Sequence, residues 1–499
     1  MKRKEVLRNA TFGLLNQIFI IARGFIIPRL IISTYGSNVN GLVSSITNFL
    51  AFITLLDGGF NVVIKSLLYK PIVNKDKKQI ESILYSSNRF FRRIAGIFII
   101  YIVLLLIIYP QITSDFNWKF IDLLIIVISI STFFEYYFGI TYRIFLEASG
   151  KSYLISIINS LVTILSTIVI TFLVKYNYDI IIVKLFGSII FIIKPILLNV
   201  YARKKYKLCI NSDCKEYIIK NKWDGLAQHI AWVIYCNTDV AVLTLFSTLS
   251  NVSIYSVYSL VCVSLRSITG AITSGIDATF GNIIASGKKE LLEKGFDIYE
   301  IIYFSIITIL FSCAIILIIP FVKVYTLEIN DANYINSSFG IILILSEYII
   351  ALRRPYRALI HAKGHFKETR IGAWIECIIN ITLSIALVFK YGLVGIAIGT
   401  LVASLVRTIE FIYHANKKIL SRKNIISIKK IILVIISTII IILLVKYIPN
   451  VDNINYINFL INSVITILFT SMIVIIVDII FYNKKILKVL NIKNIIKQK

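Results

Sequence analysis

Long apolar runs constrain this chain more than any other feature. Fourteen runs of about 20 residues follow one another along the sequence, and a helix of that length crosses a hydrocarbon core about 30 Å thick. A membrane β-barrel would show alternating segments of about 10 residues, and these runs do not alternate. We therefore predict an all-α polytopic membrane protein with 14 transmembrane helices: 11–33, 40–66, 94–110, 119–140, 152–174, 179–200, 225–248, 253–276, 298–321, 335–354, 370–389, 393–414, 430–448 and 458–482.

Composition supports a membrane protein, because 58% of the residues are hydrophobic and only 16% are charged. A soluble core of this length could not bury so much apolar surface. The basic start at Met1–Lys4 resembles a signal peptide, but the run that follows is long, contains Arg23 and has no A-x-A cleavage site. We expect this run to remain as the first span.

The formal net charge of +27 is explained by where the basic residues lie. Lys and Arg gather in alternate loops, and the intervening loops 33–40 and 110–117 contain almost none. This is the positive-inside pattern, which predicts that both termini are cytoplasmic. We expect the basic loops to attract anionic lipids and not nucleic acid. The basic segments are 70–78, 89–93, 203–207, 288–294, 353–370 and 417–430.

The motif Y-R-x-x-x-x-A-x-G occurs at Tyr142–Gly150 and again at Tyr356–Gly364, an offset of 214 residues. Three further pairs match at offsets of 213 to 215: Asn38-Val39 with Asn251-Val252, Lys175-Tyr176 with Lys390-Tyr391, and Lys204-Lys205 with Lys417-Lys418. A nearly constant offset indicates a tandem repeat. We predict two parallel six-helix lobes, 1–210 and 211–425, followed by two appended helices and a basic cytoplasmic tail in 426–499. The glycine of each motif suits the end of a helix.

Polar residues inside the spans indicate where a substrate could bind, since each charge at a helix centre costs about 2.5–3.5 kcal/mol. Asn16 and Arg23 share a face of the first span because they are seven residues apart. The second span places Thr54, Asp57, Asn61 and Lys65 on one predicted face. The seventh and eighth spans carry Gln228, Trp232, Tyr235 and Asp239, and Ser259, Arg266, Gly270 and Thr273, respectively. We expect these four spans to line a central cleft.

Other charges interrupt the apolar spans, and the alternative role for each is an interhelical ion pair. This alternative applies to Glu135, Lys194, Glu347 and Glu376, while Arg407 and Glu410 are close enough along one helix to neutralise each other. The six Cys are scattered, and the spacing of Cys209 and Cys214 fits neither a zinc site nor a redox motif. We find no Walker loop, H-E-x-x-H or G-x-S-x-G motif, so we expect neither a bound metal nor an enzyme.

Three segments and the overall plan of spans resemble the polysaccharide transporter family of Wzx-type O-antigen flippases. The segments are Arg8-Asn9-Ala10-Thr11-Phe12-Gly13-Leu14-Leu15-Asn16, Tyr35-Gly36 and Leu55-Leu56-Asp57-Gly58-Gly59-Phe60, together with the repeated Y-R-x-x-x-x-A-x-G turn. That family belongs to the superfamily that also contains MATE-type multidrug exporters and the lipid II flippase MurJ. The resemblance covers essentially the whole chain.

The resemblance implies a substrate and its partners. The substrate would be an undecaprenyl-pyrophosphate-linked oligosaccharide, moved from the inner to the outer leaflet of the bacterial cell membrane by alternating access. Arg23 and Arg266 would bind the pyrophosphate, with Asn16, Trp232 and Tyr235 as further substrate contacts. Asp57, Asp239 and Glu347 are candidates for coupling to H⁺ or Na⁺. Pathway partners would be a glycan polymerase and glycosyltransferases.

Two other functions stay open at this point. A cation-coupled multidrug exporter of the MATE type would have the same fold but a site dominated by carboxylates and aromatic side chains, so the intramembrane arginines count against it. A membrane glycan polymerase or acyltransferase is a different class of protein. The short outer loops, of about 5–15 residues, count against a polymerase.

Overall fold

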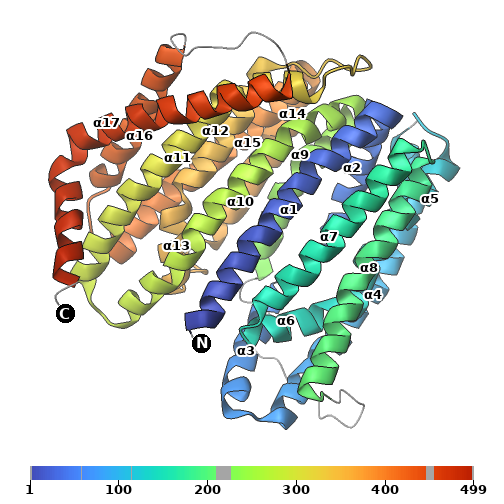
Figure 1. The fold of residues 1–499 in the computed structure, drawn as a ribbon, viewed down its shortest axis with the longest axis horizontal. Coiled ribbons are helices and arrows are strands. Elements are labelled where there is room, and N and C mark those ends of the chain that lie inside the picture. The colour runs from blue at the N-terminus through green and yellow to red at the C-terminus, as the bar shows by residue number, and fades with distance from the viewer. Residues whose placement is uncertain (1–2, 58, 114, 209–225, 446–454, 497–499) are drawn as a thin grey trace. The chain divides into compact units, whose positions relative to one another are not determined.

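The computed structural model describes residues 3–496 except 58, 114, 209–225 and 446–454. Cys209 and Cys214 lie outside these described residues. The chain forms two compact units, Met1–Ser256 and Val257–Lys499, whose helices are drawn in Figure 1. All regular elements in the described ranges are helical. The lobe boundaries at 210 and 425 stay a prediction.

The first unit is built from long helices with one short, broken hairpin. Its elements are α1 (Arg3–Tyr35), α2 (Ser37–Ala51), the 3₁₀ turn η1 (Phe52–Leu55), α3 (Phe60–Asn74), α4 (Lys77–Ile112), α5 (Trp118–Phe134), the π-helical turn η2 (Glu135–Gly139), α6 (Ile140–Ala148), α7 (Ser152–Lys175), α8 (Ile180–Tyr206), α9 (Leu226–Phe246) and the start of α10 (Leu249–Ala285). Within this unit α7 packs against both α1 and α8 (Figure 1).

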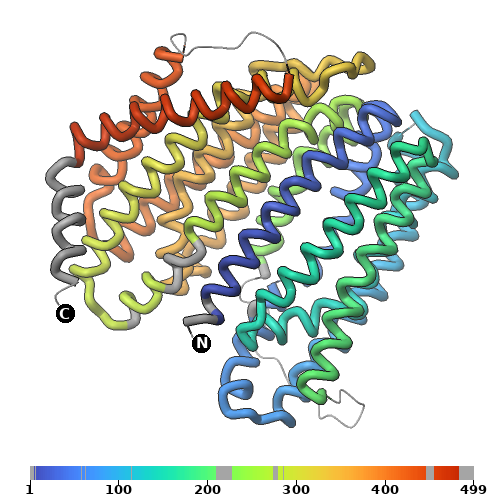
Figure 2. The backbone as a smooth tube through the Cα atoms, in the orientation of Figure 1, coloured from blue at the N-terminus to red at the C-terminus, as the bar shows by residue number. Residues whose placement is uncertain are grey.

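The second unit contains the rest of α10 and all later elements. These are α11 (Lys289–Tyr325), α12 (Ser337–Leu352), α13 (Arg354–Lys363), α14 (Arg370–Tyr391), α15 (Leu393–His414), the π-helical turn η3 (Ala415–Leu420), α16 (Ile425–Leu444) and α17 (Tyr456–Ile496). The trace in Figure 2 shows α17 running alongside α11. The basic tail from residue 483 thus continues a helix as far as Ile496.

Thirteen helices in the described part of the chain are long and apolar enough to cross a membrane. The predicted span 335–354 is the exception. It forms α12, which has 16 residues and ends at Leu352. At 1.5 Å per residue this helix is about 24 Å long, shorter than the roughly 30 Å hydrocarbon core. The protein is nevertheless a multi-pass, all-helical membrane protein, as the sequence predicts.

The predicted second span, 40–66, is not one helix. The chain leaves the helical path after Leu55, and Gly59 adopts a left-handed backbone conformation with φ of +74° before α3 begins at Phe60. Asp57 therefore lies in the break, and the proposed stripe of Thr54, Asp57, Asn61 and Lys65 on one helical face is wrong. Glycine at this position is favoured because it has no Cβ to oppose a positive φ.

The repeated Y-R-x-x-x-x-A-x-G motif has the same local structure twice. Each copy is a short helix, α6 or α13, that ends at a glycine with positive φ, +71° at Gly150 and +76° at Gly364. The N–H after each glycine donates to the carbonyl five residues earlier, at 2.9 Å from Lys151 and 3.1 Å from His365. This is the Schellman pattern. The predicted helix-ending role of the glycine is confirmed.

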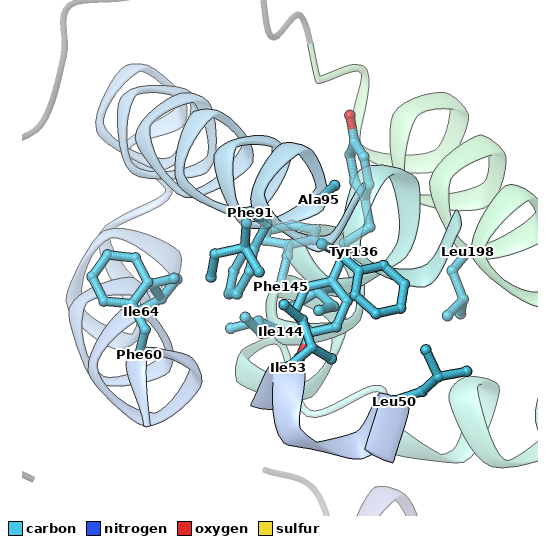
Figure 3. Close-up of a cluster of buried hydrophobic side chains, with 14 of the residues drawn as sticks. Leu50, Ile53, Phe60, Ile64, Phe91, Ala95, Tyr136, Ile144, Phe145 and Leu198 are labelled. Carbon is cyan, nitrogen blue, oxygen red and sulfur yellow. The ribbon is translucent and has the colours of Figure 1, made fainter. Parts of the chain in front are cut away.

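Apolar packing around the first copy of the motif holds the helices of the first unit together. Figure 3 shows this cluster, in which Ile144 and Phe145 of α6 meet side chains from η1, α3, α4 and α8. Phe60 and Phe91 approach edge to face, with ring centroids 6.1 Å apart. The equivalent tyrosines Tyr142 and Tyr356 are both fully buried. The motif is therefore a packing element in each unit.

Candidate substrate-binding site

The polar face of α1 points toward α7 and α8 of its own unit. Asn16 Oδ1 accepts hydrogen bonds from Asn159 Nδ2 at 2.7 Å and from Ser160 Oγ at 3.3 Å, both on α7. Asn16, predicted to contact the substrate, thus has a helix-packing role that the sequence did not show. In a membrane such interhelical bonds hold apolar helices in register.

Arg23 lies two turns further along the same face and has no comparable partner. Its guanidinium lies over the ring of Phe191 on α8, 4.4 Å from the ring centroid. Its Nε atom is buried and has no hydrogen-bond partner among the described residues. A cation over an aromatic face gains about 0.5–2 kcal/mol, which is less than the cost of an unpaired charge inside a span. Arg23 is therefore available to an anion.

Lys184 is a second cation beside Arg23, and sequence reasoning missed it. It is seven residues before Phe191, so both side chains lie on one face of α8. Lys184 and Arg23 are close enough to repel each other electrostatically. Lys184 has no ion-pair partner in the described ranges. It lies only four residues after the first residue of α8, where a lysine side chain commonly extends to the membrane surface, so the sequence alone does not indicate a site residue.

Asp57 occupies the break between η1 and α3, where it meets α9. Its Oδ1 atom lies 3.4 Å from His229 Nε2, and the same ring nitrogen is 3.0 Å from the Thr54 carbonyl oxygen. Asn61 Nδ2 also donates to Asp57, at 3.4 Å. The sequence analysis did not identify His229 as a site residue. The helix break, signalled by the glycines that follow Asp57, is what brings this carboxylate to His229.

The other predicted site residues of α9 lie on one face, as expected. The rings of Trp232 and Tyr235 are stacked with centroids 5.9 Å apart. Tyr235 is buried, whereas Trp232 is partly exposed. Asp239 is buried and accepts a hydrogen bond of 2.9 Å from Tyr255 Oη. Tyr255 thus gives Asp239 a neutral hydrogen-bond donor. A carboxylate held by a neutral donor can exchange a proton or a cation.

Arg266 differs from Arg23 because it is paired. Its guanidinium binds both carboxylate oxygens of Glu347 on α12, with Nε to Oε2 at 3.2 Å. Arg354 donates to the backbone oxygen of Arg266 at 2.9 Å. The alternative expected for midspan charges, an interhelical ion pair, therefore holds here. The expectations of a free phosphate-binding Arg266 and a free ion-coupling Glu347 need correction, because each neutralises the other.

The other midspan charges for which the sequence predicted an ion pair are also paired. Glu135 is bound by Arg143 at 2.8 Å and by Lys194 at 3.5 Å. Glu376 is bound by Arg353 at 2.6 Å. Arg407 and Glu410 contact each other along α15, which confirms the predicted neutralisation. In the part of the chain that the structure describes, no group of three or more His, Cys, Asp or Glu side chains could hold a metal ion.

The fold is that of a known class of membrane transporters. Over 96% of this chain and 99% of the other, the structure is similar to the lipid II flippase MurJ in an inward closed conformation, with a TM-score of 0.69 and 17% identity. It is also similar to MATE family multidrug resistance transporters of the MOP superfamily. The inward-facing form gives a TM-score of 0.58 over 81% of this chain and 95% of the other, at 14% identity.

The outward-facing MATE form gives a TM-score of 0.54 at 14% identity, over 84% of this chain and 96% of the other. No protein-family model matches the sequence, and no curated protein sequence matches it. The chain thus has the MurJ- and MATE-like fold that its sequence predicts. At these identities the likeness defines the fold, and the substrate has to be argued from the site.

Proposed function

We propose that the protein is a flippase for an undecaprenyl-pyrophosphate-linked oligosaccharide, moved from the inner to the outer leaflet by alternating access. The observation that supports this function is the pair of uncompensated cations, Arg23 and Lys184, on spans of the first unit. A lipid-linked substrate places an anionic headgroup at the membrane while its prenyl tail stays among the acyl chains. The fold shared with a lipid II flippase agrees with this class of substrate.

The two cations have complementary chemistry. Arginine presents a planar fork of donors that matches two phosphate oxygens, whereas lysine acts as a compact point charge. Together they would hold a diphosphate more tightly than either alone, because it carries charge on both phosphates. Binding would also relieve the repulsion between Arg23 and Lys184. In the empty site this repulsion is unfavourable. Headgroup binding removes it, and its release adds to the free energy of binding.

The direction of transport follows from the membrane potential. With the cytoplasm negative, each negative charge carried outward gains about 2.3 kcal/mol per 100 mV. Trp232, whose ring is partly exposed, and Tyr235 remain the proposed sugar-facing contacts. Asp57 and Asp239 remain the proposed coupling residues of the first unit, Asp57 now together with His229.

A cation-coupled drug exporter is the second candidate, and the likeness to MATE transporters favours it. Such a site would use carboxylates to bind cationic drugs. Asp57 and Asp239 are carboxylates of the first unit, but each already has a donor from the protein. Arg23 and Lys184, which have no counter-ion in the described part of this unit, would repel a cationic drug. We therefore place the flippase first.

The test compares Arg23→Ala with a matched arginine variant, Arg143→Ala, in cells that depend on this protein for surface glycan. Removing Arg143 leaves Glu135 paired with Lys194. We expect Arg23→Ala to abolish surface glycan while the protein still accumulates in the membrane, and Arg143→Ala to retain most of it. Normal glycan in Arg23→Ala would remove the cationic site. Drug resistance on overexpression, with normal glycan in cells lacking the protein, would select the exporter.

A further inference from the structure

A small polar cavity lies within the second unit, between α11, α16 and α17. Its volume is about 20 Å³, which is enough for one water-sized occupant. Six polar side chains are among its lining residues, in otherwise apolar surroundings. They are Ser305, Thr308, Lys430, Ser437, Asp478 and Tyr482. The three helices pack against one another in Figure 2.

The hydroxyl groups of this cavity are oriented to act as acceptors. Ser437 Oγ donates its hydrogen to the carbonyl four residues earlier on α16, at 2.8 Å, and Thr308 Oγ1 does the same on α11, at 2.7 Å. A hydroxyl that donates in this way keeps two lone pairs. One lone pair of Thr308 accepts from Tyr348 Oη at 3.1 Å. Both side chains thus still have oxygen lone pairs to offer to a bound group.

The charges around the cavity do not balance. Lys430 Nζ is bound by Glu300 at 2.6 Å and by Asp297. Arg422 also binds Glu300, at 2.9 Å. These two cations and two carboxylates neutralise one another. Asp478 is left over as a third carboxylate.

Asp478 has no ion-pair partner in the described ranges. Its Oδ2 atom accepts a hydrogen bond of 2.6 Å from Ser305 Oγ. A single carboxylate inside a membrane span needs a counter-charge. Among the described side chains, one negative charge at the cavity is thus left without a counter-charge.

We propose that the cavity is a binding site for one sodium-sized monovalent cation, coordinated by Asp478, Ser305, Thr308 and Ser437. Oxygen-only ligands suit hard cations. A single surplus negative charge is neutralised by a monovalent ion, whereas a divalent ion would leave a net positive charge in a medium of low dielectric constant. A volume of about 20 Å³ is large enough for one such ion. The site is built from other helices than those that carry Arg23 and Lys184.

This site would give the appended helices a role. α16 and α17 have no counterpart in the first repeat, yet they contribute Ser437 and Asp478 to the cavity, and α11 contributes the other two oxygen ligands. The ion would join all three helices through one contact. A cation gradient could thereby act on the second unit whatever substrate the protein carries, so the inference does not depend on the proposed flippase activity.

The experiment measures ²²Na⁺ binding to the purified full-length protein in detergent, at constant ionic strength set with choline chloride. We expect saturable binding of about one Na⁺ per chain, lost in Asp478→Asn and weakened at least tenfold in Ser437→Ala. The matched control is Ser463→Ala, which removes a serine that makes the same backbone hydrogen bond on α17 but does not line the cavity. Ser463→Ala should bind as the unmodified protein does.

Thermal unfolding provides a second readout, since a ligand that binds only the folded state raises Tm. Na⁺ should raise Tm over equal choline in the unmodified protein and in Ser463→Ala, but not in Asp478→Asn. Absence of saturable ²²Na⁺ binding in the unmodified protein would overturn the proposal. Equal ²²Na⁺ binding by Asp478→Asn would also overturn it. A Tm that responds to pH and not to Na⁺ would overturn it as well, because that result would indicate a protonated Asp478 beside a water molecule. Na⁺ binding without glycan flipping would leave this site intact and refute only the proposed function.

Discussion

Arg266→Ala should destabilise the second unit, unlike Arg23→Ala in the first. Removing Arg266 leaves Glu347, whose side chain is only 7% exposed, without its bidentate partner. Breaking a buried ion pair by removing one partner costs about 3–5 kcal/mol. The Arg266 side chain is 33% exposed, and Arg354 also interacts electrostatically with Glu347. We therefore expect a loss near the lower end, about 3 kcal/mol.

Thermal unfolding in detergent, followed by size-exclusion chromatography, measures this effect. For a folding unit of this size, a loss of about 3 kcal/mol lowers Tm by roughly 6–12 °C. The double variant Arg266→Met/Glu347→Leu removes both charges, and we expect it to recover most of the loss because no unpaired charge remains. Arg23→Ala should leave Tm unchanged or raise it. Unchanged stability in Arg266→Ala, or a double variant as unstable as the single one, would refute the assignment of Arg266 to a structural pair.

Three further outcomes follow from the structure. Glu300→Gln should lower stability by about 3–5 kcal/mol, because fully buried Glu300 accepts from Tyr356, Arg422 and Lys430; thermal unfolding checks this. Gly41→Ala should cost about 1–3 kcal/mol, since a Cβ built there would clash with the backbone oxygen of Leu249; the yield of folded protein checks this. Burial lowers the pKa of His361, which lies outside the thirteen candidate spans, to about 4. The free energy of unfolding should therefore fall as pH drops from about 6.5 toward 4, because in this range only the unfolded chain takes up the proton. His361→Gln should flatten this pH dependence in acid titrations.

Hydropathy was sufficient to predict most of the membrane-spanning helices, and the repeated motif predicted two helix ends. Apolar length predicts spans because an unpaired backbone group in hydrocarbon is so costly that only helices and closed barrels cross a membrane. The helix-ending glycines Gly150 and Gly364 were predictable because their role depends on local backbone geometry. The break after Leu55 was missed, although two glycines follow Asp57 and pointed to it.

The site was only partly predictable, because ion pairing depends on which helices meet. Helical periodicity identifies the face of α10 that carries Arg266, but its partner Glu347 lies 81 residues away on α12. No local pattern distinguishes this paired arginine from the unpaired Arg23. Lys184 was missed for a related reason: a lysine near a helix end is compatible with contact at the membrane surface, and only the packing of α8 shows its electrostatic interaction with Arg23.

The central claim is that Arg23 and Lys184 together hold an anionic lipid headgroup. It is tested most directly by measuring flipping of a fluorescent undecaprenyl-pyrophosphate oligosaccharide in proteoliposomes containing the unmodified protein, Arg23→Met, Lys184→Met or Arg143→Ala. We predict that both Arg23→Met and Lys184→Met lose at least tenfold in flipping rate at unchanged Tm, while Arg143→Ala flips nearly normally. Normal flipping by Lys184→Met and Arg23→Met would contradict the account.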